Sequence, residues 1–156
     1  MTLLSMFKWL GHSALGQYMQ TSVWAFAVVE TIHLIALAAL GGSLLLMHLG
    51  LLGLLRQIPI RKLASALFPI VLSSLIAMVV TGVLMVSEEA LKCYFSPAFR
   101  VKMLALAVAV VIYFPLLAIR TWATEDRIPW WFRAGATFSL LSWLAVGLAG
   151  RAIGLL

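Results

Sequence analysis

The sequence predicts an all-α integral membrane protein, a four-helix antiparallel bundle with a short amphipathic helix at its N-terminus. Of the 156 residues, 64% are hydrophobic and only 10% are charged, whereas soluble domains carry about 25% charged residues. Four apolar runs are each long enough to cross a hydrocarbon core of about 30 Å. Because short stretches connect these runs, successive helices are expected to be antiparallel within a single membrane domain, residues 1–156.

Residues 1–20 precede the first apolar run and are predicted to lie in the membrane interface. Their apolar side chains recur at helical spacing with polar residues between them, which is typical of an interfacial amphipathic helix. A cleaved signal peptide is disfavoured because the positive charge follows the first apolar residues and no small-residue cleavage site stands out. The apolar positions are Leu3, Met6, Phe7, Leu10, Ala14 and Tyr18.

The first span is predicted over residues 22–55. As one helix it would be about 50 Å long, which exceeds the bilayer core, so it must tilt, protrude or bend. The pair Gly41 and Gly42 is the natural position for a bend. Two hairpinned helices are disfavoured because no polar stretch separates the two halves of the run.

The other spans are bounded by prolines and polar stretches, and they are predicted over residues 63–88, 97–122 and 131–155. A short loop over residues 89–96 leads to Pro97, which suits the first turn of a helix. Pro115 is expected to kink the third span. Residues 124–129 form the last connection.

The net charge of +6 is a topology signal rather than a nucleic-acid site, because the eleven Lys and Arg residues are scattered between apolar runs. Slightly more of them fall in the first and third connections than on the opposite side. The positive-inside rule then places both termini outside the cytoplasm. A single cysteine, Cys93, excludes an intrachain disulfide and a cysteine-rich metal site.

Glu30 and His33 form the strongest functional signal in the chain. They lie one helical turn apart within the first apolar run, so they share one helix face. A bilayer penalises an ionisable side chain near its centre by several kcal/mol, and such residues mark ligand sites or proton pathways. The pair therefore indicates a cofactor ligand or a proton-handling site, with a hydrogen-bonded packing histidine as the equal alternative.

The predicted spans bring further cations to the same outer half of the bundle. His33 lies roughly 16 Å and Lys102 roughly 8 Å from the outer ends of their helices, and Arg100 and Arg151 lie nearby. An imidazole for iron and basic groups for two propionates are what a haem requires. Gly82, beside Thr81, would let a flat macrocycle approach the backbone.

These cations also have ordinary structural readings. Lys102 can extend its ammonium to the lipid headgroups, and Arg100 and Arg151 can anchor lipid phosphates. His48 lies roughly 22 Å from His33 along an unbroken helix, so the two cannot bind one iron. We expect His48 to be structural or interfacial, with a second haem as the alternative.

Several motifs resemble a family of uncharacterised small bacterial membrane proteins, and they extend over nearly the whole chain after the amphipathic segment. They are VETIHLIAL at residues 29–37, Gly41 with Gly42, LLGL at 51–54, TGVL at 81–84, SPAFRVK at 96–102, SLLSW at 139–143, and Gly150 with Arg151. The resemblance implies a multi-pass protein of the bacterial inner membrane.

A more distant similarity is to the membrane protoporphyrinogen oxidase that binds haem b and to the copper-resistance D-type membrane domain. By that resemblance His33 matches the haem-ligand histidine and Lys102 the essential lysine. The chain departs from the oxidase in its amphipathic segment and in its second histidine, His48, which puts porphyrinogen oxidation in doubt more than haem binding.

The leading hypothesis is therefore a b-type haem protein with His33 as the metal ligand. Lys102, Arg100 or Arg151 would hold propionates or supply the second axial position, and Glu30 would orient the imidazole or relay a proton. The function would be electron transfer to or from quinone or a partner protein, or oxidation of a bound substrate, so enzymatic activity stays open.

A second hypothesis is a cofactor-free accessory subunit that associates with itself or with a larger membrane complex. The small residues Gly147, Gly150 and Gly154 would suit close helix contacts. A metal-ion permease is a weaker third reading, because one carboxylate and two distant histidines do not assemble a multi-ligand path.

Overall fold

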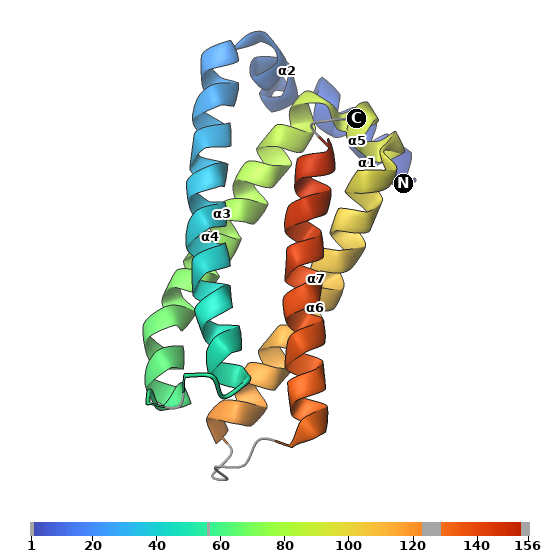
Figure 1. The fold of residues 1–156 in the computed structure, drawn as a ribbon. Helices are drawn as coiled ribbons and strands as arrows, with labels where there is room; N and C mark the ends of the chain where they lie inside the picture. The colour runs from blue at the N-terminus through green and yellow to red at the C-terminus, as the bar shows by residue number, and fades with distance from the viewer. Residues whose placement is uncertain (1, 56, 123–128, 154–156) are drawn as a thin grey trace.

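The computed structural model describes residues 2–55, 57–122 and 129–153, and of residues 120–122 and 151–153 only the backbone. The described residues are helical and contain no strand (Figure 1). In chain order the helices are α1 (Leu3–His12), α2 (Ala14–Thr21), α3 (Val23–Leu51), α4 (Ile60–Glu88), α5 (Ala90–Phe95), α6 (Pro97–Trp122) and α7 (Trp130–Ile153).

Four of these helices, α3, α4, α6 and α7, are long and apolar enough to cross a membrane. Successive members run in opposite directions, and the end of α6 and the start of α7 lie at the same end of the bundle as the α3–α4 connection (Figure 1). The predicted all-α, four-helix antiparallel membrane bundle is thereby confirmed, and the chain is a multi-pass membrane protein.

The first span ends earlier than predicted, at Leu51 instead of residue 55. The amide of Leu54 bonds to the carbonyl of Leu49 at 2.9 Å, and that of Gly53 bonds to Gly50 at 3.0 Å. This is the Schellman pattern, which needs a left-handed residue after the helix, and Gly53 supplies it with φ 78°. The α-helix runs without interruption through the glycine pair at 41 and 42, where a bend was expected.

The other spans lie close to their predicted positions. The helix α4 begins at Ile60, three residues before the predicted start. At the start of α6, Pro97 follows the capping residue Ser96, whose hydroxyl accepts from the amide of Phe99 at 3.3 Å. Pro115 lies inside α6 without ending it. The predicted connection over residues 124–129 lies outside the described residues except for Pro129.

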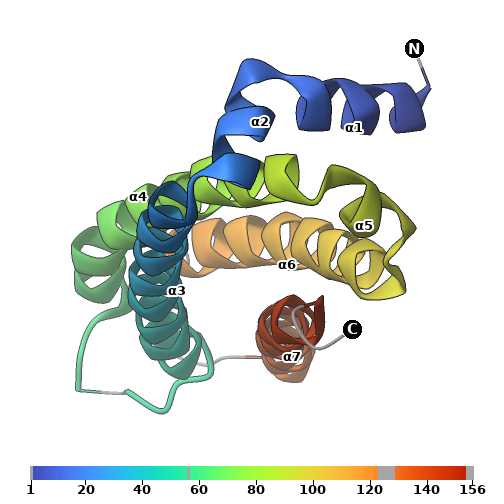
Figure 2. The same cartoon turned by 90° about the horizontal axis from the view of Figure 1, so that it is seen from above.

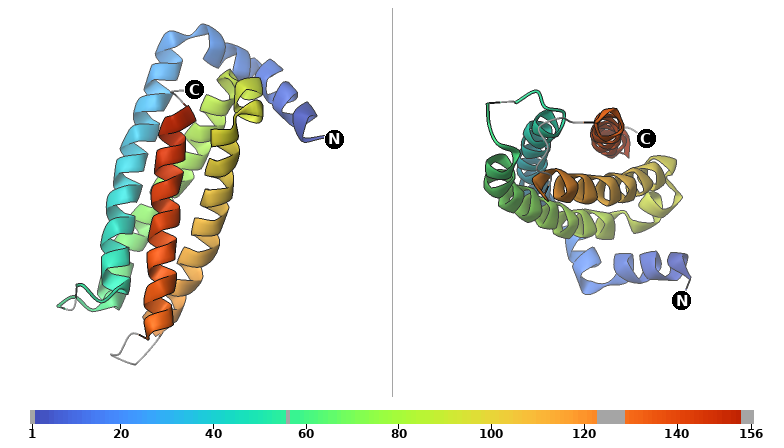
Figure 3. Two further views of the ribbon diagram at one scale, coloured as in Figure 1. Left: turned by 45° about the vertical axis from the view of Figure 1, so that its right-hand side comes forward. Right: turned by 90° about the horizontal axis from the view of Figure 1, so that it is seen from below.

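The N-terminal segment forms two helices where one was predicted. Ser13 separates them, because its hydroxyl donates to the carbonyl of Leu10 at 2.6 Å and accepts from the amide of Gly16 at 3.1 Å. The predicted loop over residues 89–96 contains the short helix α5. Figures 2 and 3 show α1 beside α4 and α5, on the side of the bundle away from α7.

The bundle consists of two closely packed helix pairs, α3 with α4 and α6 with α7. Their shared core lies toward the end that holds the α3–α4 connection (Figure 1). Its buried members are Leu40, Leu44, Met47, Leu51, Ala64, Val71, Tyr113, Leu116, Leu117, Phe132 and Ala136. Toward the other end, where α1, α2 and α5 lie, two adjoining cavities separate the pairs.

Candidate functional site

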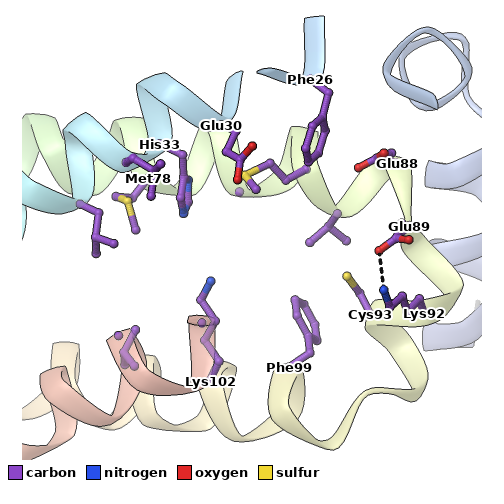
Figure 4. A pocket seen from close by; sticks show the side chains of 18 residues that line it. Phe26, Glu30, His33, Met78, Glu88, Glu89, Lys92, Cys93, Phe99 and Lys102 are labelled. Atoms are coloured by element: carbon purple, nitrogen blue, oxygen red, sulfur yellow. Dashed lines mark ion pairs between the residues drawn. The ribbon is translucent and has the colours of Figure 1, made fainter. Parts of the chain in front are cut away.

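A cavity of about 320 Å³ lies between the two helix pairs at the end covered by α1, α2 and α5. Figure 4 shows side chains from α3 and α4 facing side chains from α6 across it. Its volume falls within the range of about 300–1,000 Å³ that is typical of cofactor and small-molecule sites. The polar residues that line it are Glu30, His33, Glu88, Glu89, Lys92, Cys93 and Lys102.

A second cavity of about 580 Å³ adjoins the first and is lined almost entirely by apolar side chains. Its only charged or titratable lining residues among those described are His33 and Lys102, which line the first cavity as well. Gly82 and Gly147 also border both spaces. The two cavities therefore meet where the histidine and the lysine face each other.

A hydrogen bond of 2.7 Å between the Thr81 hydroxyl and Nδ1 of His33 joins α4 to α3. The same hydroxyl lies 2.6 Å from the Ala77 carbonyl oxygen one turn earlier, and a hydroxyl has one hydrogen to give. Because a carbonyl oxygen can only accept, we assign that hydrogen to Ala77 and the Nδ1–H tautomer to His33. The other ring nitrogen, Nε2, then carries a lone pair, and it has no hydrogen-bond partner among the described residues.

Gly82 lies beside the histidine ring and leaves open surface there. A Cβ at Gly82 would lie at an ordinary contact distance, 3.7 Å, from Cε1 of His33. The neighbouring Thr81 is buried. Two successive residues of α4 thus serve the histidine: Thr81 supplies the hydrogen-bond acceptor for the ring, and Gly82 leaves the open surface beside it.

Lys102 reaches the cavity from the opposite helix pair. Its side chain lies across Gly150 of α7, where a Cβ would come within 3.4 Å of the lysine Nζ. Figure 4 shows the ammonium pointing across the cavity toward His33. Among the described residues this half-buried cation has no hydrogen bond or ion pair. It is available to an anionic or hydrogen-bond-accepting ligand.

Two other predicted site residues are placed differently. Glu30 lines the cavity one turn from His33 with an exposed side chain, but Thr81 and not Glu30 holds the imidazole. Arg100 is exposed and lines neither cavity; it donates to the carbonyl of Tyr94 at 3.3 Å and lies 5.7 Å above that ring. The side chain of Arg151 lies outside the described residues.

Residues at the end of α4 and in α5 also line the first cavity, although they were not predicted as site residues. Lys92 and Glu89 form an exposed ion pair at 3.2 Å (Figure 4). Cys93 is buried beside them, and this burial, followed by the charge of Glu89, raises the pKa of its thiol above the ordinary value.

His48, the second intramembrane histidine, has a different environment. It is fully buried, its Nδ1–H donates to the Leu44 carbonyl at 2.7 Å, and its Nε2 accepts from the Ser139 hydroxyl at 3.1 Å. Both ring nitrogens are thereby used inside the protein. His48 joins α3 to α7 and offers no lone pair to a metal.

The small-residue face of α7, considered above for partner contacts, points toward the cavities. Gly147 lines both of them, with no atom within 4 Å of where its Cβ would be, and Gly150 accommodates Lys102. Gly154 lies outside the described residues. The glycines therefore make space within the chain.

Residues 6–156 match one protein family, whose description reads "Family of unknown function (DUF6644)". No curated protein and no solved structure matches the chain.

Proposed function

The chain belongs to this family of unknown function, and we propose from its site that it is a b-type haem protein of the membrane with His33 as an axial ligand. One observation carries the proposal: Thr81 binds Nδ1–H of His33, which leaves the Nε2 lone pair free at a cofactor-sized cavity. A ligand histidine whose other nitrogen is held by a hydrogen bond is the usual arrangement at protein metal sites.

The donor set favours a haem over a bare metal ion. No group of three or more His, Cys, Asp or Glu side chains in the described part of the chain is arranged to hold a metal ion. A haem supplies four nitrogen ligands of its own and asks the protein for one or two axial ligands. One free imidazole at the junction of the two cavities suits that requirement.

The residues around the cavity suit the rest of the macrocycle. Gly82, beside the histidine, and Gly147 of α7 leave open surface on the walls of the cavity. Lys102, on the opposite wall, would bind a propionate or supply the second axial position. Arg100 and Arg151 were candidates for the same role; Arg100 is engaged with Tyr94, so Lys102 is the preferred partner.

A bound haem supplies one-electron redox chemistry, and this chain's residues would tune and position it. Thr81 fixes the tautomer of His33, and Glu30, at the cavity rim, is placed to relay a proton between the interior and water. The function proposed is electron transfer, or oxidation of a bound substrate, in the bacterial inner membrane with both termini in the periplasm. The distant resemblance to the haem-b-binding protoporphyrinogen oxidase supports the cofactor rather than that substrate.

The test is an absorption spectrum of the protein purified in mild detergent after expression with added haem precursor. We expect a Soret band and sharpened bands after reduction with dithionite, both lost in His33→Ala. The matched control is His12→Ala, which removes an exposed histidine that lines neither cavity. A featureless wild-type spectrum at good yield, or a normal one in His33→Ala, would overturn the proposal.

A further inference from the structure

The larger cavity is the feature that the haem proposal leaves unexplained. We propose that it binds a lipid-soluble quinone, which enters sideways from the bilayer between α3 and α7 and rests its carbonyl on Lys102. The redox role of that quinone rests on the proposed haem function, whereas its binding site is argued from the cavity itself.

The cavity reaches the lipid-facing surface of the bundle. Leu45 of α3 and Leu144 of α7 both line it, and they are 49% and 56% exposed. One turn before Leu45, Gly41 is exposed and has no atom within 4 Å of where its Cβ would be. A ligand dissolved in the hydrocarbon layer can therefore enter at this level without crossing water.

The N-terminal segment covers part of the opposite side. Phe7 and Leu10 of α1 line the same cavity, and the Phe7 ring packs edge-on against Tyr94 and Phe99 at centroid distances of 5.4 and 6.0 Å. The segment is tied down by Gln20, whose side-chain amide donates to the Glu88 carbonyl at 3.0 Å. The gap between α3 and α7 has no such cover among the described residues.

The polar group that lines the larger cavity beside His33, the ammonium of Lys102, determines which ligand head group can bind there. As an ammonium, the form that would also bind a propionate, Lys102 has three hydrogens to donate and no lone pair, so the group that binds it must accept hydrogen bonds. Gly82 and Gly147 bound the space beside it and leave room for a flat ring. A quinone combines a flat ring, two carbonyl acceptors and an apolar chain, and the chain would lie among the leucines of α3 and α7.

The position of the larger cavity next to His33 accounts for the proposed redox role of the quinone. His33 and Lys102 line both cavities, so a quinone in the larger one would lie against whatever occupies the smaller one. A carrier confined to the membrane would then exchange electrons without a soluble partner. Two redox partners were considered above, a quinone and a partner protein, and this arrangement favours the quinone.

The test uses the full chain in detergent and a photoreactive azidoquinone, with labelled peptides identified by mass spectrometry. The chain offers a matched pair of variants, Gly41→Leu and Gly42→Leu. Neither glycine has an atom within 4 Å of where its Cβ would be, but only Gly41 lines the cavity. We expect labelling of cavity residues, at least tenfold weaker in Gly41→Leu and unchanged in Gly42→Leu.

Competition decides between ligand classes. An unlabelled short-chain quinone should suppress the labelling, and palmitate should not; suppression by palmitate alone, or equal labelling of the two variants, would overturn the quinone assignment. The haem spectrum of the same preparations separates the two proposals. Haem without quinone labelling overturns only this inference, whereas labelling without haem confirms the binding site and removes its proposed redox role.

Discussion

A single hydroxyl decides which nitrogen of His33 is free. With its hydrogen directed at the Ala77 carbonyl, as assigned above, the Thr81 hydroxyl accepts from Nδ1–H of the histidine. In Thr81→Val the shape is kept and the acceptor is lost, so the ring loses its preferred tautomer and orientation. We expect haem affinity to fall roughly 10- to 100-fold, the usual cost of losing such a partner, as measured by haem titration of the apoprotein.

The serine variant provides the rescue for this test. Thr81→Ser keeps the hydroxyl, and its haem affinity should stay close to that of the wild type. Thr31→Val is the matched control, since Thr31 also donates to a carbonyl four residues earlier, at 2.7 Å, but lines neither cavity. Equal affinities for the valine and serine variants at position 81 would contradict the orienting role.

His48 should affect stability and leave the haem spectrum unchanged. In Ser139→Ala the buried Nε2 of His48 loses its donor, which we expect to cost about 1 kcal/mol of folding free energy. The measurement is unfolding in mixed detergent. Ser142→Ala is the control, because Ser142 is similarly buried on α7 but bonds only to its own helix, at Phe138. A loss of haem in Ser139→Ala would assign His48 to the site instead.

Cys93 should react with maleimide more slowly than an ordinary thiol. Burial, followed by the charge of Glu89, raises the pKa of this thiol, so the reactive thiolate forms only at a higher pH. The pH–rate profile of the folded protein is expected to lie to the alkaline side of the profile in denaturing detergent. Coinciding profiles would show that the thiol is exposed in solution.

The sequence predicted the residues of the site better than their roles. His33, Gly82 and Lys102 meet as expected, because each lies in the outer half of its span and the spans are antiparallel. Thr81 was not recognised as the partner of His33, since that bond depends on how α3 and α4 rotate against each other. Helix geometry already argued against Arg100 as a site residue. It is two residues from Lys102, about 200° around the helix, so both side chains cannot face one cavity.

At the scale of elements, hydropathy predicted the four spans, and local hydrogen bonding decided what hydropathy could not see. The end of α3 depends on the left-handed Gly53, and the corner between α1 and α2 depends on the two bonds of Ser13. Neither changes the apolar pattern. The helix α5 was read as a loop because six residues are too few for a periodicity to emerge.

The corner between α1 and α2 is built on Gly16. A Cβ there would lie 2.6 and 2.7 Å from the carbonyl oxygens of Leu10 and Gly11, which are backbone and cannot move aside. Gly16→Val should therefore detach the segment from α4 and α5 and speed maleimide labelling of Cys93. Ala14→Val adds bulk at an exposed position of the same helix and should leave the rate unchanged; equal rates in both would mean that Cys93 is not shielded by the segment.

At the scale of the whole molecule, the two ends of the bundle have different structural roles. Large buried side chains join the pairs at one end, and the same pairs stay apart at the other, where His33 and Lys102 face the cavities. The hydropathy pattern could not predict this division, because apolar residues fill both halves of every span. It depends on where small residues such as Gly82 and Gly147 fall.

The division also makes membrane orientation a functional question, because it decides which side of the membrane the cavity rim faces. By the sequence, slightly more of the Lys and Arg residues fall in or next to the connections at the packed end, with Arg61 and Lys62 in the first turn of α4. The positive-inside rule predicts that this end faces the cytoplasm and that the rim with Glu30, Glu88 and Glu89 faces the periplasm. We expect a C-terminal alkaline phosphatase fusion to be active and a C-terminal green fluorescent protein fusion to be dark.

A matched pair of fusions completes this test. Placed after residue 57, between α3 and α4, the reporters should behave in the opposite way, with a dark phosphatase and a bright fluorescent protein. If both pairs gave the reverse result, the rim would face the cytoplasm. Protons for the proposed site would then come from that compartment through Glu30, and an electron-transfer role would use cytoplasmic rather than periplasmic protons.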